Sequence, residues 1–424
     1  MGDVNITKKQ WNAHLITILM VSVSLMAFFG VNKPYVYMFA FFVIAFTQVK
    51  LEVYYIWHVY LIVCIWSLFL YLIRDSTGIF FSRYISQLAK LSTVFMEVFV
   101  GIFLARRLSV EYMKSAVLKT FIFILLMGIY QYVAIKFGLP HWGLYIWKNV
   151  VEVDLNFGSR INSLMGEPKY FAILCSVLSC YYLHRLFCSF NVRNILLFSA
   201  SVWCLYNTGS ALGITSAFIP TLYVIYRRYV DFPITYKLIL SILISFSFVF
   251  LLLYYERLEF SFTLRESHYK LLDDFSFASE FIYYLDDLIK IPLLTWIDYP
   301  YLVIFGFGYG LLHIFSIDNL NYASWFSIEY GYIDSNLGFV SMISNFGLIL
   351  FLLYSIYIPK WVKKSSVDSS ERLFFLLTIF IPVFFGAVDL MPSFLLIGFV
   401  LGKALGKHKQ NEKKLTSINK LEHR

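Results

Sequence analysis

The stretch of sequence from Glu256 to Asn336 interrupts a chain that is otherwise apolar almost from end to end. It opens with ERLEFSFTLRESHYKLLDD at 256–274, passes through FGFGYG at 305–310 and closes with DSN at 334–336. Loops longer than about 15 residues are uncommon in compact proteins and are usually functional. We therefore expect Glu256–Asn336 to form a small domain outside a membrane, carried by the rest of the chain.

The composition of the chain excludes a soluble protein. Of 424 residues, 59% are hydrophobic and only 14% are charged, whereas soluble domains carry about 25% charged residues. Apolar windows recur at about the 20 residues that cross a hydrocarbon core of roughly 30 Å. The sequence thus predicts an all-α polytopic membrane protein with about twelve transmembrane helices, at 14–30, 34–50, 54–73, 91–105, 115–137, 168–187, 192–208, 210–226, 236–255, 337–358, 373–389 and 392–406. The last two windows could also form one re-entrant hairpin around Pro392.

The basic residues predict which way the chain crosses the membrane. With twelve crossings, both termini share one side, and that side carries most of the 35 lysines and arginines. Such an excess marks cytoplasmic loops, so we expect cytoplasmic termini in a multi-pass protein of the inner (cytoplasmic) membrane. The same bias accounts for the net charge of +9, and no nucleic-acid partner is expected. The predicted parts are a membrane domain at 1–255 with an outer segment at 138–167, an extracytoplasmic domain at 256–336, membrane spans at 337–406 and a basic tail at 407–424.

Two features of the long stretch predict local structure. Over Phe275–Trp296, apolar residues recur at helical spacing while Glu280, Asp286, Asp287 and Lys290 share the opposite face. This pattern predicts an amphipathic helix resting on the bilayer or on the bundle. The glycine run Gly306–Gly310 predicts a tight turn, with backbone donors for an anion as the alternative, because this GxGxG follows no strand and opens no helix.

The residues best suited to chemistry lie in the shorter outer segment, which reads RINSLMGEP at 160–168. Arg160 carries a permanently charged guanidinium, which can clamp a phosphate or diphosphate through two parallel hydrogen bonds. Glu167 before Pro168 makes a sound helix start, with its carboxylate near the positive end of the helix dipole. A purely structural role for Glu167 therefore stays open.

This segment resembles the R-x-x-S-x-x-x-E-P segment of the O-antigen polymerase and O-antigen ligase superfamily of membrane glycosyltransferases. The similarity covers roughly residues 155–355, while the N-terminal third of the chain matches only by hydropathy. Further matches follow in the order found in the family, at Asn207-Thr208-Gly209-Ser210, Arg265, Pro300 with Phe305-Gly306-Phe307-Gly308, and Ser335-Asn336 leading into Ser344-Asn345-Phe346-Gly347-Leu348.

The resemblance implies a GT-C-like enzyme that acts outside the cytoplasm on glycans linked to undecaprenyl diphosphate. It implies no nucleotide sugar, no metal ion and no other cofactor. Ligases typically carry a histidine before the asparagine that ends the large loop, and Ser335-Asn336 here favours a polymerase of O-antigen or capsule. Neither Arg160 nor Arg265 begins the R-x10-G motif described for some polymerases. The expected partners are lipid-linked repeat units and membrane lipids, and a chain-length regulator is left open.

Transfer of such a glycan needs fixed positive charge for the departing diphosphate and a base for the attacking sugar hydroxyl. We expect Arg160 and Arg265 to bind the diphosphate, with Arg257, Lys270 and Asn336 as further candidates. The candidate bases, in order of preference, are Glu167, Asp334 and His268. Asp334 could instead cap the helix that follows it, and His268 could be a solvated loop residue.

Two other functions stay open. A ligase would transfer finished polymer to lipid A-core or another acceptor. A flippase for lipid-linked oligosaccharides would also have about twelve spans, but transporters usually place polar residues at mid-bilayer, whereas this chain gathers them in two outer segments. Glu97 is an exception in mid-span, and it would line a substrate path or serve as a structural residue.

Overall fold

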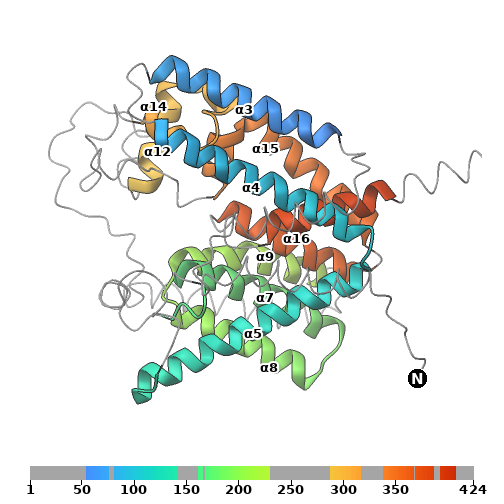
Figure 1. Ribbon diagram of the computed structural model, residues 1–424. Coiled ribbons are helices and arrows are strands. Elements are labelled where there is room, and N and C mark those ends of the chain that lie inside the picture. The colour runs from blue at the N-terminus through green and yellow to red at the C-terminus, as the bar shows by residue number, and fades with distance from the viewer. Residues whose placement is uncertain are drawn as a thin grey trace, which may run out of the picture.

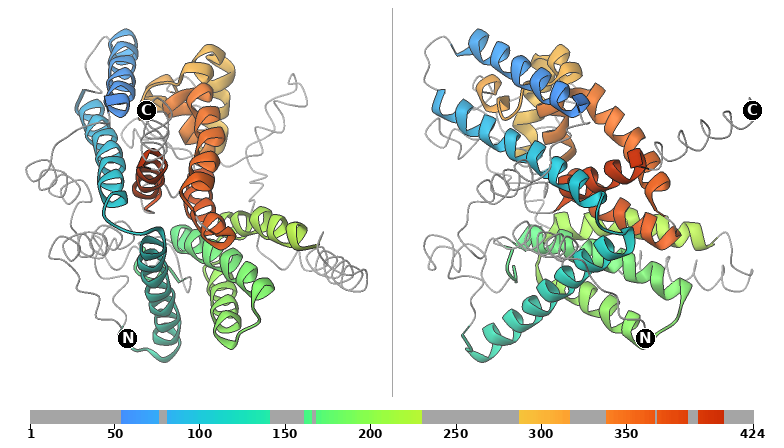
Figure 2. Two further views of the ribbon diagram at one scale, coloured as in Figure 1. Left: turned by 90° about the vertical axis from the view of Figure 1, so that its right-hand side faces the viewer. Right: turned by 45° about the vertical axis from the view of Figure 1, so that its right-hand side comes forward.

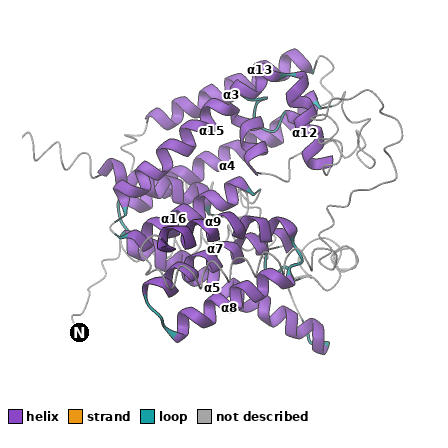
Figure 3. Cartoon of the chain, turned by 180° about the vertical axis from the view of Figure 1, so that it is seen from behind, coloured by secondary structure: helices purple, strands orange, loops and turns teal. Residues whose placement is uncertain are grey.

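The structure is a computed structural model that describes residues 54–75, 81–140, 161–165, 168–229, 287–316, 338–366, 368–385 and 392–406. Throughout these ranges every regular element is a helix (Figure 3). Five helices are long and apolar enough to cross a membrane, namely α3 (Tyr54–Arg74), α4 (Phe81–Ala105), α5 (Val110–Phe137), α7 (Pro168–Cys188) and α15 (Gly338–Ser365). The predicted class, an all-helical membrane protein, is thus confirmed in the described part. The windows at 14–30, 34–50 and 236–255 lie outside it, so the number twelve stays a prediction.

The other helices of the described part are shorter. They are α8 (Val192–Asn207), α9 (Ala211–Tyr229), α12 (Asp287–Asp298), α13 (Pro300–Phe305), α14 (Leu312–Phe315), α16 (Ser369–Phe384) and an apolar helix at Ser393–Gly406. α12, α13 and α14 all come from the predicted extracytoplasmic stretch. The extracytoplasmic placement of that stretch stays a prediction.

The described helices form two groups joined by α16 (Figure 1). One group contains α5, α7, α8 and α9, and the other contains α3, α4, α12, α13, α14 and α15. Both turned views keep these groups on separate halves of the molecule (Figure 2). α16 packs against α5 and α7 on one side and against α15 on the other. The Ser393–Gly406 helix packs against α4, where its Gly398 lies on the backbone of Val98.

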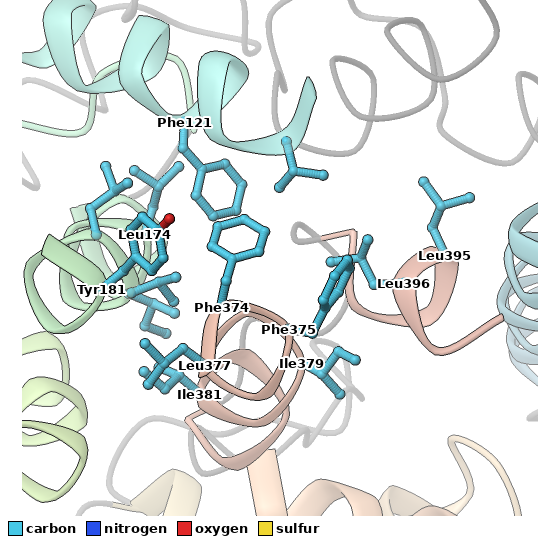
Figure 4. Close-up of a cluster of buried hydrophobic side chains, with 14 of the residues drawn as sticks. Phe121, Leu174, Tyr181, Phe374, Phe375, Leu377, Ile379, Ile381, Leu395 and Leu396 are labelled. Atoms are coloured by element: carbon cyan, nitrogen blue, oxygen red, sulfur yellow. The ribbon is translucent and has the colours of Figure 1, made fainter. Parts of the chain in front are cut away.

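The core at this junction is largely apolar and rich in aromatic rings. Phe121 from α5, Tyr181 from α7 and Phe374 from α16 converge in one cluster (Figure 4). The rings of Tyr181 and Phe374 meet edge to face with centroids 5.3 Å apart. Such pairs contribute about 0.5–1.5 kcal/mol beyond their burial. The cluster therefore fixes α16 between the two groups.

Small residues bring neighbouring helices into close contact, as is common in membranes. A Cβ added to Gly213 of α9 would lie 2.2 Å from Cβ of Ala172 in α7. One turn along, the hydroxyls of Ser176 and Ser216 are 2.7 Å apart. A Cβ on Gly398 would lie 2.0 Å from the carbonyl oxygen of Val98 in α4. These contacts leave no room for larger side chains at either crossing.

The three short connections α4–α5, α7–α8 and α15–α16 have basic residues within or beside them. A salt bridge of 3.6 Å joins Lys114 near the start of α5 to Glu371 in the first turn of α16, and the Asp368 side chain caps α16 by accepting from the backbone N–H of Glu371. The basic residues at these connections are Arg106, Arg107, Arg185, Arg193, Lys363, Lys364 and Arg372. This distribution agrees with the charge pattern used to predict a cytoplasmic side, while the sidedness itself stays a prediction.

Two elements differ from the sequence expectation. α4 begins at Phe81, ten residues before the expected window, because its first turns are too polar for a hydropathy window but still bury Tyr84 and Gln87. α12 was expected to carry Lys290 on a polar face, yet Lys290 is only 5% exposed. A lysine can bury its aliphatic stem along apolar neighbours, which the simple pattern of polar and apolar positions does not anticipate.

Candidate functional site

All eight residues proposed from the sequence to act on substrate lie outside the described residues, namely Arg160, Glu167, Arg257, Arg265, His268, Lys270, Asp334 and Asn336. Their roles stay predictions. The described part does contain the segments that flank Arg160 and Glu167, together with most of the other segments on which the family resemblance rests. These segments meet in two clusters.

The first cluster is organised by the turn Ile161–Met165, here called the outer turn. Its five residues are all buried. Gln131 in α5 holds it, because its Oε1 accepts from the backbone N–H groups of Asn162 and Ser163 at 3.0 and 2.6 Å. The Nε2 of Gln131 donates to Oδ1 of Asn162 at 2.6 Å. One side chain thus fixes the backbone of two successive residues.

Ser163 adds a further hydrogen bond that anchors the outer turn to α5. It is the only non-glycine residue of the described part with a positive φ, 54°, a conformation that costs most side chains about 1–2 kcal/mol. Its hydroxyl donates to the carbonyl of Ile124 in α5 at 2.6 Å. Together with the Gln131 bonds, this anchor offsets the cost of the left-handed conformation. The serine of the R-x-x-S segment therefore has a positional role in the fold.

The outer turn also contacts the connection between α8 and α9. The backbone N–H of Ile161 donates to the carbonyl of Asn207 at 3.3 Å. The chain then turns through Gly209, with φ 56°, and the Ser210 hydroxyl accepts from the N–H of Gly213 at the start of α9. Two segments of the family resemblance, separated by more than forty residues in sequence, are therefore in direct contact.

The polar groups of this cluster are neutral and buried. Gln131, Asn162, Ser163 and Thr208 bring no net charge, so the cluster itself cannot neutralise a diphosphate. It fixes Ile161–Met165, which lies in the chain between the two predicted functional residues Arg160 and Glu167. Arg160 is bonded directly to the buried Ile161, and Glu167 directly to the buried Pro168.

The second cluster is organised by Gly306–Gly310, here called the glycine turn. Gly306, Gly308 and Gly310 all have positive φ, between 69° and 90°, so the predicted tight turn is confirmed. The Trp66 indole N–H in α3 donates to the carbonyl of Gly306 at 2.9 Å. The side chain of Phe307 is fully buried among residues of α3, α4, α13 and α14.

The N–H groups of the glycine turn are used within the protein. Those of Gly306 and Phe307 donate to the carbonyls of Leu302 and Ser344 at 2.6 and 2.7 Å. Those of Tyr309 and Gly310 donate to Oγ of Ser67 and Oδ1 of Asn345 at 3.0 and 2.8 Å. Because four of the five N–H groups of the turn are taken, the turn does not present the several converging donors that an anion cradle needs.

The glycine turn packs against a break in α15. Gly347 has φ 83° and ψ 158°, which interrupts the helix after Phe346. A break inside a membrane helix frees carbonyl groups that neighbouring protein must satisfy. The Ser344 carbonyl receives the Phe307 N–H, and the Ser344 hydroxyl receives the indole N–H of Trp296 at 2.9 Å. Two further segments of the family resemblance, at 305–308 and 344–348, are therefore in direct contact.

An aromatic group lies at the end of α3 beside this cluster. The Arg74 guanidinium lies 5.8 Å from the ring centres of both Tyr299 and Phe315. Phe315 also meets Phe307 edge to face at 5.4 Å. The two ends of the segment from Tyr299 to Phe315 are thus placed at the same end of α3.

Several residues that organise these clusters were not singled out by their sequence pattern. Gln131, Trp66 and Trp296 are a polar residue and two aromatic residues in apolar surroundings. The one signal that could have marked Gln131 is its polarity within a predicted span. Glu97, which was singled out, is 1% exposed in α4, so its interior position is established and its role stays open. In the described ranges, no three His, Cys, Asp or Glu residues gather as a metal site would require.

Searches of protein-family models and of curated proteins with this sequence found no match to either.

Proposed function

We propose that this protein is a polysaccharide polymerase of the cytoplasmic membrane, making O-antigen or capsule. It would transfer a growing glycan from polyprenyl diphosphate to the terminal sugar of a lipid-linked repeat unit on the outer face. One structural observation supports the proposal most strongly. The segments that resemble the polymerase and ligase superfamily contact one another in pairs, with Ile161 on Asn207 and Phe307 on Ser344.

This pairing matters because the resemblance rests on short segments that are individually weak. Segments that share a function are expected to be held together by the fold, while chance matches would be scattered. Each pair is joined by a backbone hydrogen bond, and the outer turn is anchored further to α5, which suits the positioning of reacting groups on a rigid support. The support is for the superfamily, and the preference for a polymerase rests on Ser335-Asn336.

The proposed reaction breaks the bond between the anomeric carbon of the donor glycan and the diphosphate oxygen. A hydroxyl of the acceptor sugar forms the new bond to that carbon, and its proton passes to a carboxylate or imidazole, with Glu167 as first candidate. Arg160 and Arg265 would stabilise the negative charge that grows on the departing diphosphate. The buried outer turn would keep Arg160 and Glu167 close to one another along the chain.

One observation favours the second candidate, a flippase. Transporters often bind substrate at discontinuous helices near the bilayer midplane, and α15 is discontinuous at Gly347. At this break, however, the Ser344 carbonyl and the donors of the facing turn are engaged by protein groups. This arrangement suits a structural crossing better than a site that must exchange ligands.

The glycolipids of a cell that lacks the protein distinguish these functions. A polymerase defect leaves single repeat units on the carrier lipid at the outer face. A ligase defect leaves full-length polymer on the carrier, and a flippase defect leaves repeat units at the cytoplasmic face. The last two outcomes would each replace the proposed function with the corresponding alternative.

A further inference from the structure

The segment Tyr299–Phe315 starts beside the C-terminal end of α3, runs along that helix toward its middle, and returns to the same end. Tyr299 and Phe315 both lie beside Arg74, in the last turn of α3. Between them, Gly306 and Tyr309 bind Trp66 and Ser67. Trp66 and Ser67 lie about eight residues before Arg74 in α3, which is roughly 12 Å along the helix at 1.5 Å per residue.

Two other helices give a similar depth for the glycine turn. Gly306 abuts Gly347, which lies about nine residues, or roughly 13 Å, after the start of α15 at Gly338. Gly310 abuts the side chain of Gln87, about six residues, or roughly 9 Å, after the start of α4. α3 itself has 21 residues, and its length of about 31 Å matches the hydrocarbon core of a bilayer. With α3 spanning that core, the glycine turn lies well inside it.

From this geometry we propose that Tyr299–Phe315 is a re-entrant element of the membrane domain, with its outward side in contact with lipid acyl chains. It enters at the level of Arg74, descends through α13, turns at Gly306–Gly310 and returns through α14. This placement takes the segment out of the water-exposed domain that its position within Glu256–Asn336 led us to expect.

The polar groups of the segment fit that depth. Non-helical backbone is tolerated at membrane depth only where protein or a cavity satisfies it. The N–H groups of Gly306, Phe307, Tyr309 and Gly310 and the carbonyl of Gly306 are all bonded to α3, α13 or α15. Tyr309 and Gly310 are only half-buried, and their N–H groups still bond to protein rather than being left for water.

The outward side of the segment is apolar and continues a surface of α3. Tyr301, Ile304 and Phe305 are exposed, Phe305 by 58%. The Trp66 ring joins this patch to α3, with its centre 6.2 Å from Phe305 and 5.8 Å from the exposed Phe69. A patch continuous with the exposed apolar face of a membrane-crossing helix is suited to acyl chains, whereas in water it would favour association.

Photocrosslinking of the full chain tests this placement. Phe305→p-benzoylphenylalanine would be irradiated in nanodiscs of phosphatidylethanolamine and phosphatidylglycerol, and lipid adducts would be measured by mass spectrometry. The membrane control carries the same probe at Ile65 on the exposed face of α3, and the water control at Phe190, 85% exposed in the α7–α8 connection.

The proposal predicts lipid adducts at position 305 with a yield within about twofold of that at position 65, and at least about tenfold above position 190. A yield at 305 equal to that at 190 would overturn it. If the variant at 305 does not fold, the probe at Tyr301 or Ile304 gives the same comparison. The outcome does not depend on whether the protein is a polymerase, a ligase or a flippase.

Discussion

Gly306 and Gly347 face each other so closely that neither position has room for a side chain. A Cβ on Gly306 would lie 2.7 Å from the backbone nitrogen of Gly347, and a Cβ on Gly347 would lie 2.7 Å from the nitrogen of Gly306. Both residues also have positive φ, at 90° and 83°. With ψ of 151° and 158°, each occupies a backbone region that is essentially restricted to glycine.

Gly347→Ala is therefore expected to destabilise the membrane domain. The strained backbone alone costs about 1–3 kcal/mol, and the clash with the glycine turn adds to it. The midpoint of thermal unfolding in detergent, followed by size-exclusion chromatography, should fall by at least a few degrees.

Two glycines with open surroundings serve as controls for this variant. Gly138 has φ 65° and Gly406 has no positive φ, and neither would bring a Cβ within 4 Å of another atom. Gly138→Ala should show only the backbone cost, and Gly406→Ala should unfold as the natural protein does. Equal stability of the variants at 347 and 406 would mean that the two glycines do not meet as described.

Trp66→Phe is expected to destabilise the packing of the glycine turn by removing a hydrogen bond rather than by adding a clash. Phenylalanine keeps most of the ring packing but removes the N–H that binds the Gly306 carbonyl. An acceptor left unsatisfied in an apolar environment costs about 1–3 kcal/mol. Trp203→Phe is the matched control, because the described side-chain contact of Trp203 is ring packing on Tyr132 and its other described bond uses the backbone carbonyl. If both variants unfold at the same temperature, the indole bond contributes nothing.

Gln131→Leu should lower stability and should also impair the activity of the protein that does fold. Leucine fills a similar volume but releases the backbone N–H groups of Asn162 and Ser163, so the outer turn is no longer fixed beside Arg160 and Glu167. Misplacement by about 1 Å can cost a reaction about 100-fold. Under the proposed function, the rate of polymer formation in membranes should fall by about 10- to 100-fold.

Gln131→Glu tests whether positioning explains that loss. Glutamate keeps an oxygen that can accept from both N–H groups, but it replaces the donor to Asn162 with a second oxygen and adds a charge at a buried position. It should retain more activity than leucine at equal protein levels, with the change in kcat rather than in KM. If Gln131→Leu forms polymer at the natural rate, the outer turn does not position the reacting groups.

The sequence predicts the long helices well and their partners poorly. The start of α7 at Pro168 and the extent of α3 follow from apolar length and from helix-start residues. Nothing in hydropathy says that Gly306 meets Gly347, because each glycine alone is compatible with any turn or kink. Likewise Gln131 is a single polar residue in an apolar window, and its role depends on the outer turn about thirty residues later.

Local residue patterns predict two elements of the candidate site. Pro168 preceded by Glu167 predicted a helix start and the glycine run predicted a turn, and the structure agrees at both places. The pairing of the family segments required the fold, since backbone contacts such as that between Ile161 and Asn207 leave no trace in residue type. The eight predicted functional residues stay predictions, because they lie outside the described part of the chain.

Under the proposed function, Arg160 stabilises the departing diphosphate of a polymerase reaction. The most direct test compares the lipid-linked glycans of cells whose only copy carries Arg160→Ala with cells carrying Lys169→Ala. Lys169 is a nearby cation packed on Tyr170, with 4.7 Å between its Nζ and the ring centre. If Arg160 binds the diphosphate, Arg160→Ala should leave single repeat units on the carrier lipid, while Lys169→Ala should make polymer of normal length. Long polymer of normal amount from Arg160→Ala, at natural protein levels, would contradict this role of Arg160.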